Sequence, residues 1–327
     1  MVDLRGWRTR IDAAAERLAG RVRETEMRKA EELSVRLGAP LFLKLENRQW
    51  TGSFKLRGAT NAAALLSEAE RARGLVTTSS GNHGRALAHA ARALGAHSIV
   101  FLSPQVPQYK RDALADLGAE IRIAGRSQDE AEDAAREMAA ADGRTFVSPF
   151  DDPAIIAGQG TIGDEILAQL PDVELVVVPL SGGGLVSGVA ACLKERHPEI
   201  RVIGASMERG AAMHASLAAG HPVEVAELPT LADALAGGIG RDNRYTFAMV
   251  RDLLDDAVLV SEEEIAAAIR VAASLGEVVE GGGAVGLAAL IAGKVRLAGP
   301  TVALLSGGNI DPALHRKITA GERAYGL

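Results

Sequence analysis

The stretch Glu174-Leu175-Val176-Val177-Val178-Pro179-Leu180-Ser181-Gly182-Gly183-Gly184-Leu185 joins a continuous apolar run to a turn of three glycines. An apolar run without alternation is expected for a strand that is covered on both faces, as in a parallel sheet. A helical pattern over residues 186–195 follows directly. We therefore predict a strand–turn–helix unit, in which three glycines let the main chain wrap closely around an anion. An ordinary tight turn between strand and helix explains the glycines equally well.

The same alternation of strand and helix continues along most of the chain and is typical of βαβ units in a largely parallel sheet. The clearest break is Ser148-Pro149-Phe150-Asp151-Asp152-Pro153, where two prolines and turn residues indicate a domain crossing. The part before about residue 45 is expected to pack with the C-terminal half. We predict strands at 40–45, 74–78, 98–102, 120–123, 174–179, 201–205 and 301–305, and helices at 55–69, 83–94, 108–117, 129–141, 162–170, 186–195 and 261–275.

Composition excludes several classes of protein. The chain has 327 residues, a net charge of -6 and only 3% aromatic residues, which argues against a nucleic-acid partner. The single cysteine, Cys192, excludes an intrachain disulfide and fits a reducing cytoplasm. Residues 1–20 contain no apolar signal core, and the apolar stretch 281–293 is too short to span a bilayer. We expect a cytoplasmic protein that acts on a small molecule.

A lysine stands where a helix is expected to begin, in Thr51-Gly52-Ser53-Phe54-Lys55-Leu56-Arg57-Gly58. Burial lowers the pKa of a lysine, and the neutral amine can attack a carbonyl to form a Schiff base. Taken alone, Lys55 is better explained as a surface lysine on a helix. Lys44 and Arg57 are expected to occupy ordinary amphipathic positions.

Three further turns contain polar or charged side chains beside glycines: Ser79-Ser80-Gly81-Asn82-His83-Gly84, Glu280-Gly281-Gly282-Gly283 and Ser306-Gly307-Gly308-Asn309. The first and the third directly follow predicted strands. Ligands of open α/β sheets gather at the carboxyl ends of strands, and helix N-termini there suit a carboxylate or a phosphate. Each turn also has a plainer explanation, because Ser80 or Asn82 could cap a helix and Glu280 could lie in a charged cap turn.

Together these motifs resemble the fold-type II pyridoxal-phosphate enzymes, in the group of serine/threonine dehydratases (threonine ammonia-lyases) and serine racemases. Lys44-Leu45-Glu46-Asn47 and Ile156-Ala157-Gly158-Gln159-Gly160-Thr161 complete the likeness. The resemblance implies an α/β fold like that of the tryptophan synthase β subunit, with two open, twisted, mostly parallel sheets flanked by helices. It also implies a large cofactor-binding domain (1–50 and 150–327), a small domain (51–149) and an active site between them.

The resemblance also implies residue roles. Lys55 would hold pyridoxal 5′-phosphate as a Schiff base, and Phe54 would pack beside the ring. Asn82 would bind the ring 3′-oxygen, and Ser306 the pyridine nitrogen. The other cofactor contacts would come from Ser181, Gly182, Gly183, Gly184 and Leu185 around the phosphate, and from Glu280 and Gly307. The substrate carboxylate would be held by Ser79, Ser80, Asn82 and His83.

The reaction implied is β-elimination from a 3-hydroxy amino acid such as L-threonine or L-serine, which gives a 2-oxo acid and ammonia. Lys55 would be the general base, and Ser80 could serve the opposite face of Cα. A neutral serine cannot stabilise a protonated pyridine nitrogen as an aspartate can. Electron withdrawal into the ring is therefore weaker, which favours elimination over transamination. The alternatives are a racemase, a β-replacement synthase, a dehydratase of the hydroxyectoine-utilisation branch, and a cofactor-binding carrier or regulator without catalysis.

Some positions depart from the family pattern. Ser206-Met207 stands where some relatives bind a divalent cation through Glu-Pro, so a divalent cation site is in doubt and we name no metal ligand. Arg23-Glu24-Thr25-Glu26-Met27 replaces a stretch that lines the entrance in many relatives, and this leaves the substrate open. The resemblance implies a homodimer without a membrane partner. No regulatory domain is expected after Leu327.

Overall fold

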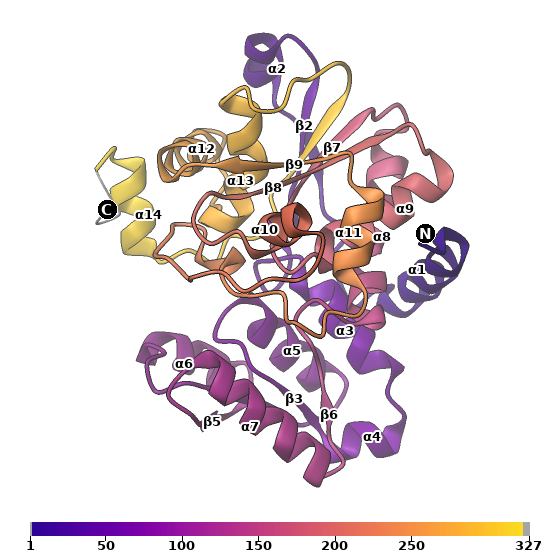
Figure 1. Ribbon diagram of the computed structural model, residues 1–327, viewed down its shortest axis with the longest axis vertical. Helices are drawn as coiled ribbons and strands as arrows, with labels where there is room; N and C mark the ends of the chain where they lie inside the picture. The colour runs from indigo at the N-terminus through magenta and orange to yellow at the C-terminus, as the bar shows by residue number, and fades with distance from the viewer. Residues whose placement is uncertain (1, 323–327) are drawn as a thin grey trace.

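The computed structural model describes residues 2–322 and contains two sheets flanked by helices (Figure 1). The larger sheet has the strand order β1-β2-β10-β7-β8-β9, and the smaller sheet has the order β5-β4-β3-β6. All strand pairs are parallel except β1–β2 at the edge of the larger sheet. This arrangement confirms the predicted α/β class with two mostly parallel sheets.

The larger sheet contains β1 (Met27–Lys29), β2 (Leu41–Lys44), β7 (Leu175–Pro179), β8 (Arg201–Met207), β9 (Asp256–Val260) and β10 (Thr301–Leu304). It is accompanied by α1 (Leu4–Leu18), α2 (Glu31–Leu37), α8 (Pro153–Gln169), α9 (Gly184–Arg196), α10 (Ala212–Ala219), α11 (Thr246–Leu253), α12 (Glu262–Ser274), α13 (Gly281–Ile291) and α14 (Pro312–Thr319), with the short 3₁₀ helices η1 (Glu46–Arg48) and η2 (Asp233–Leu235).

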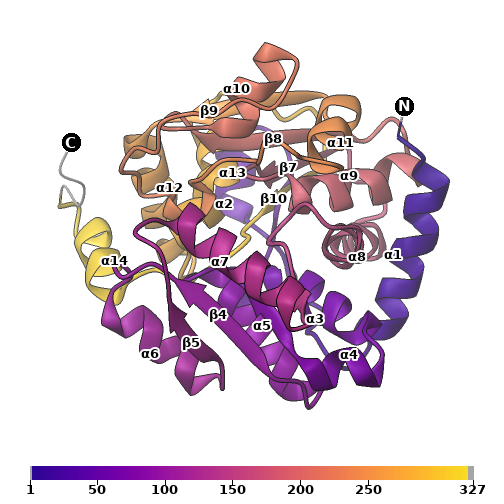
Figure 2. The same cartoon turned by 60° about the horizontal axis from the view of Figure 1, so that its bottom comes forward.

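The smaller sheet contains β3 (Leu75–Thr77), β4 (Ser98–Leu102), β5 (Glu120–Ile123) and β6 (Thr145–Phe146). Its helices are α3 (Lys55–Leu65), α4 (Glu68–Arg73), α5 (Asn82–Ala93), α6 (Gln108–Asp116) and α7 (Gln128–Ala141). In Figure 2, β4 and β5 lie with α5 and α6, while α8, α9 and α1 stand beside the larger sheet.

The continuous apolar run of β7 is buried on both faces, as its sequence predicts. Leu175 and Val177 join the core that includes residues of α12 and α13, whereas Val176 and Val178 join the core formed with α8 and α9. Side chains alternate between the faces of a strand, so a run without polar residues is stable only where helices cover both sides. This double cover fixes α9, and the glycine turn before it, at the carboxyl end of β7.

Every predicted strand is present to within two residues at each end, but some helices differ. The predicted helix 55–69 is divided, because Ser67 begins α4 with a capping box to Glu70. The helix predicted from 162 begins at Pro153, where Asp152 caps two backbone N–H groups. The capping box of Ser261 and Glu264 is confirmed.

Most of the apolar stretch 281–293 forms a buried helix, α13, which the sequence patterns did not predict. Helix α13 begins with three glycines, which are poor helix formers, yet all its residues from Gly281 to Leu290 are buried. It packs against β7, β8 and β10. Packing against the sheet therefore overrides the local preference of the glycines. No helix in the described part of the chain combines the length and apolarity that crossing a bilayer would need.

The chain crosses between the sheets twice, after β2 and after β6. The N-terminal strands β1 and β2 pair next to β10, which places the N-terminal segment with the C-terminal half. Helix α3 lies where the two parts meet in Figure 1. The division at residues 50 and 150 remains a proposal that these crossings support.

Candidate active site

The stretch that holds the predicted catalytic lysine is joined to the end of β10. The backbone N–H of Phe54 donates to the carbonyl of Ser306 (3.0 Å), and Ser53 forms a bridge with Gly307. Phe54 is followed at once by α3, so Lys55 is the first residue of that helix. The turn after β10 and the start of α3 are therefore neighbours, as the position at the carboxyl ends of the strands predicts.

Lys55 is partly buried and has a main-chain carbonyl as its hydrogen-bond partner. Its Nζ donates to the Pro149 carbonyl (2.6 Å) and lies 5.3 Å from the centre of the Phe54 ring. Burial lowers the pKa of Lys55 to about 8, although the charge of Glu280 opposes this effect. A substantial fraction of this amine is therefore neutral near pH 8, which makes it available as a nucleophile or a base.

Asn82, Glu280 and Asn309 form a hydrogen-bonded cluster beside this turn. The Asn82 Nδ2 donates to Glu280 Oε1 (2.5 Å), and Asn309 Nδ2 donates to Asn82 Oδ1 (2.6 Å). The Glu280 side chain is buried, and burial raises its pKa to about 7 against the opposing hydrogen bond from Asn82. The backbone N–H of Glu280 donates to the carbonyl of Gly307 (3.0 Å). Helices α5 and α13 and the turn after β10 thus meet at one point.

The triple-glycine turn lies against the segment that Lys55 contacts. A Cβ at Gly182 would lie 2.4 Å from the ring of Phe150, the residue after Pro149, and a Cβ at Gly184 would lie 2.8 Å from the Phe150 carbonyl oxygen. Gly183 has φ +88° and caps α9. The turn therefore requires glycine for close approach and for its backbone conformation. Ser181 Oγ donates to the Leu235 carbonyl (2.9 Å), and Leu185 is buried in the first turn of α9.

The turn after β3 presents backbone N–H groups rather than capping side chains. Helix α5 begins at Asn82 with Gly81 at its N-cap, and no side-chain cap is formed, so the alternative in which Ser80 or Asn82 caps the helix is wrong. The Gly81 N–H instead donates to Ser79 Oγ (3.3 Å). Within the described residues, no hydrogen bond joins Ser80 to Lys55, and the role of Ser80 stays a prediction.

The imidazole of His83 is not suited to bind a carboxylate. Its Nε2 lies 3.1 Å from the carbonyl of Val147, and burial together with the charge of Lys55 lowers the pKa of His83 to about 3. The neutral ring donates from Nε2, which leaves Nδ1 as a buried acceptor without a partner. An acceptor cannot bind a carboxylate, so His83 can contribute only its backbone N–H.

Behind Lys55, a buried charge network corrects the expectation that Arg57 and Lys44 occupy ordinary amphipathic positions. Arg57 is 1% exposed and pairs with Glu46 (2.7 Å) and Glu165 (2.6 Å). Lys44 is fully buried and also pairs with Glu165 (2.6 Å). The network ties α3 to η1 and α8. Sequence reasoning missed it because the partners are distant in the chain, although Lys44, Glu46 and Arg57 all lie in the quoted motifs and were a usable signal.

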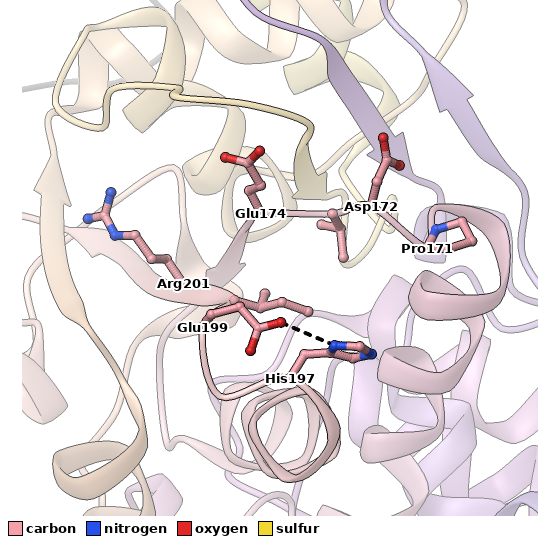
Figure 3. A pocket seen from close by; sticks show the side chains of 8 residues that line it. Pro171, Asp172, Glu174, His197, Glu199 and Arg201 are labelled. Carbon is pink, nitrogen blue, oxygen red and sulfur yellow. Dashed lines mark hydrogen bonds and ion pairs between the residues drawn. The ribbon is translucent and has the colours of Figure 1, made fainter.

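One hollow on the structure lies away from these residues. It has a volume of about 400 Å³, and Figure 3 shows that its lining includes Glu174, His197 and Arg201. Glu174 precedes β7 and Arg201 begins β8, so the hollow lies at the amino ends of these strands, opposite the turns described above. It is therefore separate from the candidate site, which we place by its convergent polar groups.

Glu208, which follows Ser206-Met207 in the chain, is paired with an ammonium group. Lys294 Nζ contacts Glu208 Oε1 (3.3 Å) and Glu264 Oε2 (2.8 Å). Among the side chains that the structure describes, no cluster of three or more histidine, cysteine or acidic residues is placed to hold a metal ion.

Comparisons with known proteins agree with this geometry. The family model described as pyridoxal-phosphate dependent enzyme matches residues 18–307. An L-threonine ammonia-lyase of Geobacter sulfurreducens is 45% identical over 93% of this chain and 75% of its own length. The processed form of threonine deaminase isoform 2 from Solanum lycopersicum has a TM-score of 0.89 at 36% identity, covering 97% of this chain and 88% of that one. Maize serine racemase has a TM-score of 0.89 at 31% identity, covering 96% of each chain.

Proposed function

The chain belongs to the family of pyridoxal-phosphate dependent enzymes, and we propose that it is an ammonia-lyase that converts L-threonine, or a related 3-hydroxy amino acid, to a 2-oxo acid and ammonia. One observation carries the proposal. A lysine amine with a pKa near 8 has a main-chain carbonyl, that of Pro149, rather than a carboxylate as its hydrogen-bond partner, and the next residue, Phe150, packs against the triple-glycine turn of α9. The 45% identity to an L-threonine ammonia-lyase supports the choice of substrate.

The residues present fit the cofactor. The buried hydroxyls of Thr51 and Ser53, on either side of Gly52, have no hydrogen-bond partner in the protein. Buried polar groups are normally paired, so these two are suited to a polar ligand. Residues 181–185 would hold the phosphate through backbone N–H groups at the start of α9, and Lys55 would bind the aldehyde carbon. Phe54, Asn82, Glu280, Ser306 and Gly307 would surround the ring.

When bound, pyridoxal phosphate supplies a conjugated system that accepts the electron pair left on Cα after proton loss. Lys55 would remove that proton, because its amine is neutral in part at neutral to mildly alkaline pH. The substrate carboxylate would lie at the N-terminus of α5, whose first backbone N–H groups have no side-chain cap. Ser79, Ser80 and Asn82 would contribute there, together with the backbone N–H of His83.

Racemisation is a second candidate activity, favoured by the likeness to maize serine racemase. Ser80 is partly buried in the turn between β3 and α5, beside the proposed carboxylate site. It would need to deliver a proton to the face of Cα opposite Lys55. Chiral analysis of serine recovered from the reaction distinguishes this activity, because a lyase without racemase activity leaves no D-serine.

We also propose that the protein is a cytoplasmic homodimer acting on a free amino acid. The buried thiol of Cys192, which forms no disulfide, is consistent with a reducing compartment. Light scattering of the purified protein should give about twice the mass of the 34.1 kDa chain. A single-chain mass at working concentration would contradict the dimer.

The proposed activity is tested by incubating purified protein with L-threonine, L-serine and 3-hydroxyaspartate while measuring ammonia and 2-oxo acid. We expect turnover of at least one of these amino acids, and loss of both turnover and the visible absorbance of the bound cofactor in Lys55→Ala. Lys29→Ala, a change at an exposed lysine paired with Glu31, is the control. Cofactor absorbance without turnover of any substrate would support a carrier instead.

A further inference from the structure

We propose that Asn309 is a positioning residue that fixes the orientation of the Asn82 side-chain amide, so that Asn82 can present only an N–H group to the ring oxygen of the cofactor. The inference rests on the proposed function and deepens it, because it concerns how one residue of the site is made selective. Asn309 would touch neither substrate nor cofactor in this role.

The hydrogen bonds run in one direction from a fixed starting point. The main-chain carbonyl of Thr51 can only accept, so the Asn309 Nδ2 that lies 2.9 Å from it must donate. The same Nδ2 donates its second hydrogen to Asn82 Oδ1 (2.6 Å). The Asn82 side-chain oxygen therefore faces Asn309.

The Asn82 Nδ2 group, which carries two hydrogens, also has a partner for one of them. It donates one hydrogen to Glu280 Oε1 (2.5 Å). One N–H of Asn82 remains free to donate, and the Asn82 oxygen is held toward Asn309. Because a carboxyl group can accept whether or not it is protonated, titration of Glu280 does not reverse this orientation.

The turn at Gly52, before Lys55, leaves room for the Asn309 side chain and helps to fix its position. Gly52 has φ +77°, and a Cβ there would lie 2.5 Å from Asn309 Oδ1. The backbone N–H of Gly308 donates to the Gly52 carbonyl (2.9 Å). The turn before Lys55 and the turn after β10 are therefore shaped around the Asn309 amide, which cannot reverse without losing its bond to Thr51.

This orientation matters chemically because the ring oxygen of the cofactor carries negative charge. A donor N–H stabilises such an oxygen, whereas an amide oxygen would repel it. A free asparagine could present either end of its amide. Asn309 removes that choice, which is why its loss should change the cofactor environment without removing the contact residue itself.

The test uses the purified holoenzyme of Asn309→Asp, with the visible absorbance spectrum and the dissociation constant for pyridoxal phosphate as readouts. The aspartate has no N–H for Asn82 Oδ1, so Asn82 turns its amide around. We expect a shifted absorbance band and a dissociation constant raised about tenfold, which corresponds to one charge-assisted hydrogen bond. Asn309→Ala adds no charge and should give a smaller rise, of about threefold, because it leaves Asn82 free to adopt either orientation.

Asn61→Asp is the matched control, since Asn61 is also buried and donates to a main-chain carbonyl, that of Ala154, but lies outside the cluster. It should keep the wild-type spectrum. Asn82→Ala provides the reference for loss of the whole contact. If both Asn309 variants keep the wild-type spectrum and cofactor affinity while Asn82→Ala loses them, the positioning role is wrong. If wild-type protein binds no chromophore, the proposed function itself fails.

Discussion

In the candidate site, burial lowers the pKa of Lys55 to about 8 and raises the pKa of Glu280 to about 7. Both shifts have burial as their largest cause, because a low-dielectric site disfavours the charged form of either group. Such paired shifts are typical of sites that transfer protons. The chain therefore holds a base and an acid that both titrate near neutral pH within one cluster.

The raised pKa of Glu280 predicts a pH-dependent stability difference. The folded protein binds this proton more tightly than the unfolded chain, so the stabilisation is complete below the ordinary carboxyl pKa of 4.5 and is lost as pH rises through about 7. In cofactor-free protein, Glu280→Gln should gain stability relative to wild type as pH increases over that range. Urea unfolding at several pH values measures the difference.

Glu199→Gln is the control for this experiment. Hydrogen bonds, with its own backbone N–H contributing most, lower the pKa of the exposed Glu199. This carboxyl is therefore ionised in both folded and unfolded protein over the upper part of the range, and its removal should not reproduce the gain. A constant stability difference between Glu280→Gln and wild type from pH 4.5 to 7 would contradict the buried, protonated state of Glu280.

At the scale of elements, the start of α3 is held by charges that are largely buried. Arg57, on the first turn of α3, bridges Glu46 of η1 and Glu165 of α8. Burial alone would raise the pKa of Glu46, but Arg57, together with Thr25 and Lys44, outweighs burial and lowers it. Lys55 stands two residues before Arg57, so this network determines where the lysine backbone lies.

Removing Arg57 should be strongly destabilising because it leaves the buried Glu46 without its ion-pair partner and removes one of the two partners of Glu165. We expect Arg57→Ala to lose roughly 3–5 kcal/mol of the free energy of unfolding, as for other broken buried pairs. The double variant Arg57→Met with Glu46→Leu should lose less, since one uncompensated charge is removed as well. Arg126→Ala, at a side chain that is 90% exposed, should cost under about 0.5 kcal/mol. Equal losses for the single and double variants would contradict this account.

The glycine turn before α9 gives a second prediction at this scale. A Cβ at Gly183 would lie 2.9–3.0 Å from Met213, Thr246 and Val250, and φ is +88°. Gly220 has a similar φ of +76°, but nothing lies within 4 Å of the place that a Cβ would take there. Gly220→Ala should therefore cost only the backbone term of about 1 kcal/mol, whereas Gly183→Ala should cost roughly 1–3 kcal/mol more.

The cofactor titration of Gly183→Ala provides the functional part of that comparison. Movement of the turn should weaken phosphate binding, while Gly220→Ala keeps the wild-type affinity. Urea unfolding and titration with pyridoxal phosphate measure the two effects separately. Equal stability and equal affinity in the two variants would show that the turn tolerates a side chain.

At the scale of the whole molecule, the site exists only where parts of both sheets meet. Lys55 and Asn82 begin helices beside the smaller sheet, whereas Ser306 and the glycine turn follow strands of the larger one. A ligand that contacts both sides binds the folded chain and not the unfolded one. Its binding energy therefore adds to the stability of both parts together.

This arrangement predicts that pyridoxal phosphate stabilises the protein as one unit. Adding cofactor at a hundred times its dissociation constant should contribute about 2.7 kcal/mol and raise the melting temperature by several degrees. Calorimetry should show one transition that moves with cofactor concentration. A second transition that does not move would mean that one of the sheets unfolds independently of the site.

Much of the fold could be predicted from the sequence because it depends on local patterns. Apolar runs such as 175–179 and 301–304 specify buried strands wherever they occur, and the glycine turns after them follow from backbone geometry. What failed depended on distant partners. Helix α13 begins with glycines and forms because β7, β8 and β10 bury it, and the short β1 gains its hydrogen bonds only from β2.

The same distinction between local patterns and distant partners applies to the candidate site. The sequence by itself determined which residues carry chemistry, because a lysine amine, an amide and three consecutive glycines have properties that no fold needs to supply. Only the tertiary structure decided their states: the pKa of Lys55, the neutral His83 ring facing Val147 and the direction of the Asn82 amide. Those depend on burial and on partners more than 60 residues away, and a local pattern contains neither.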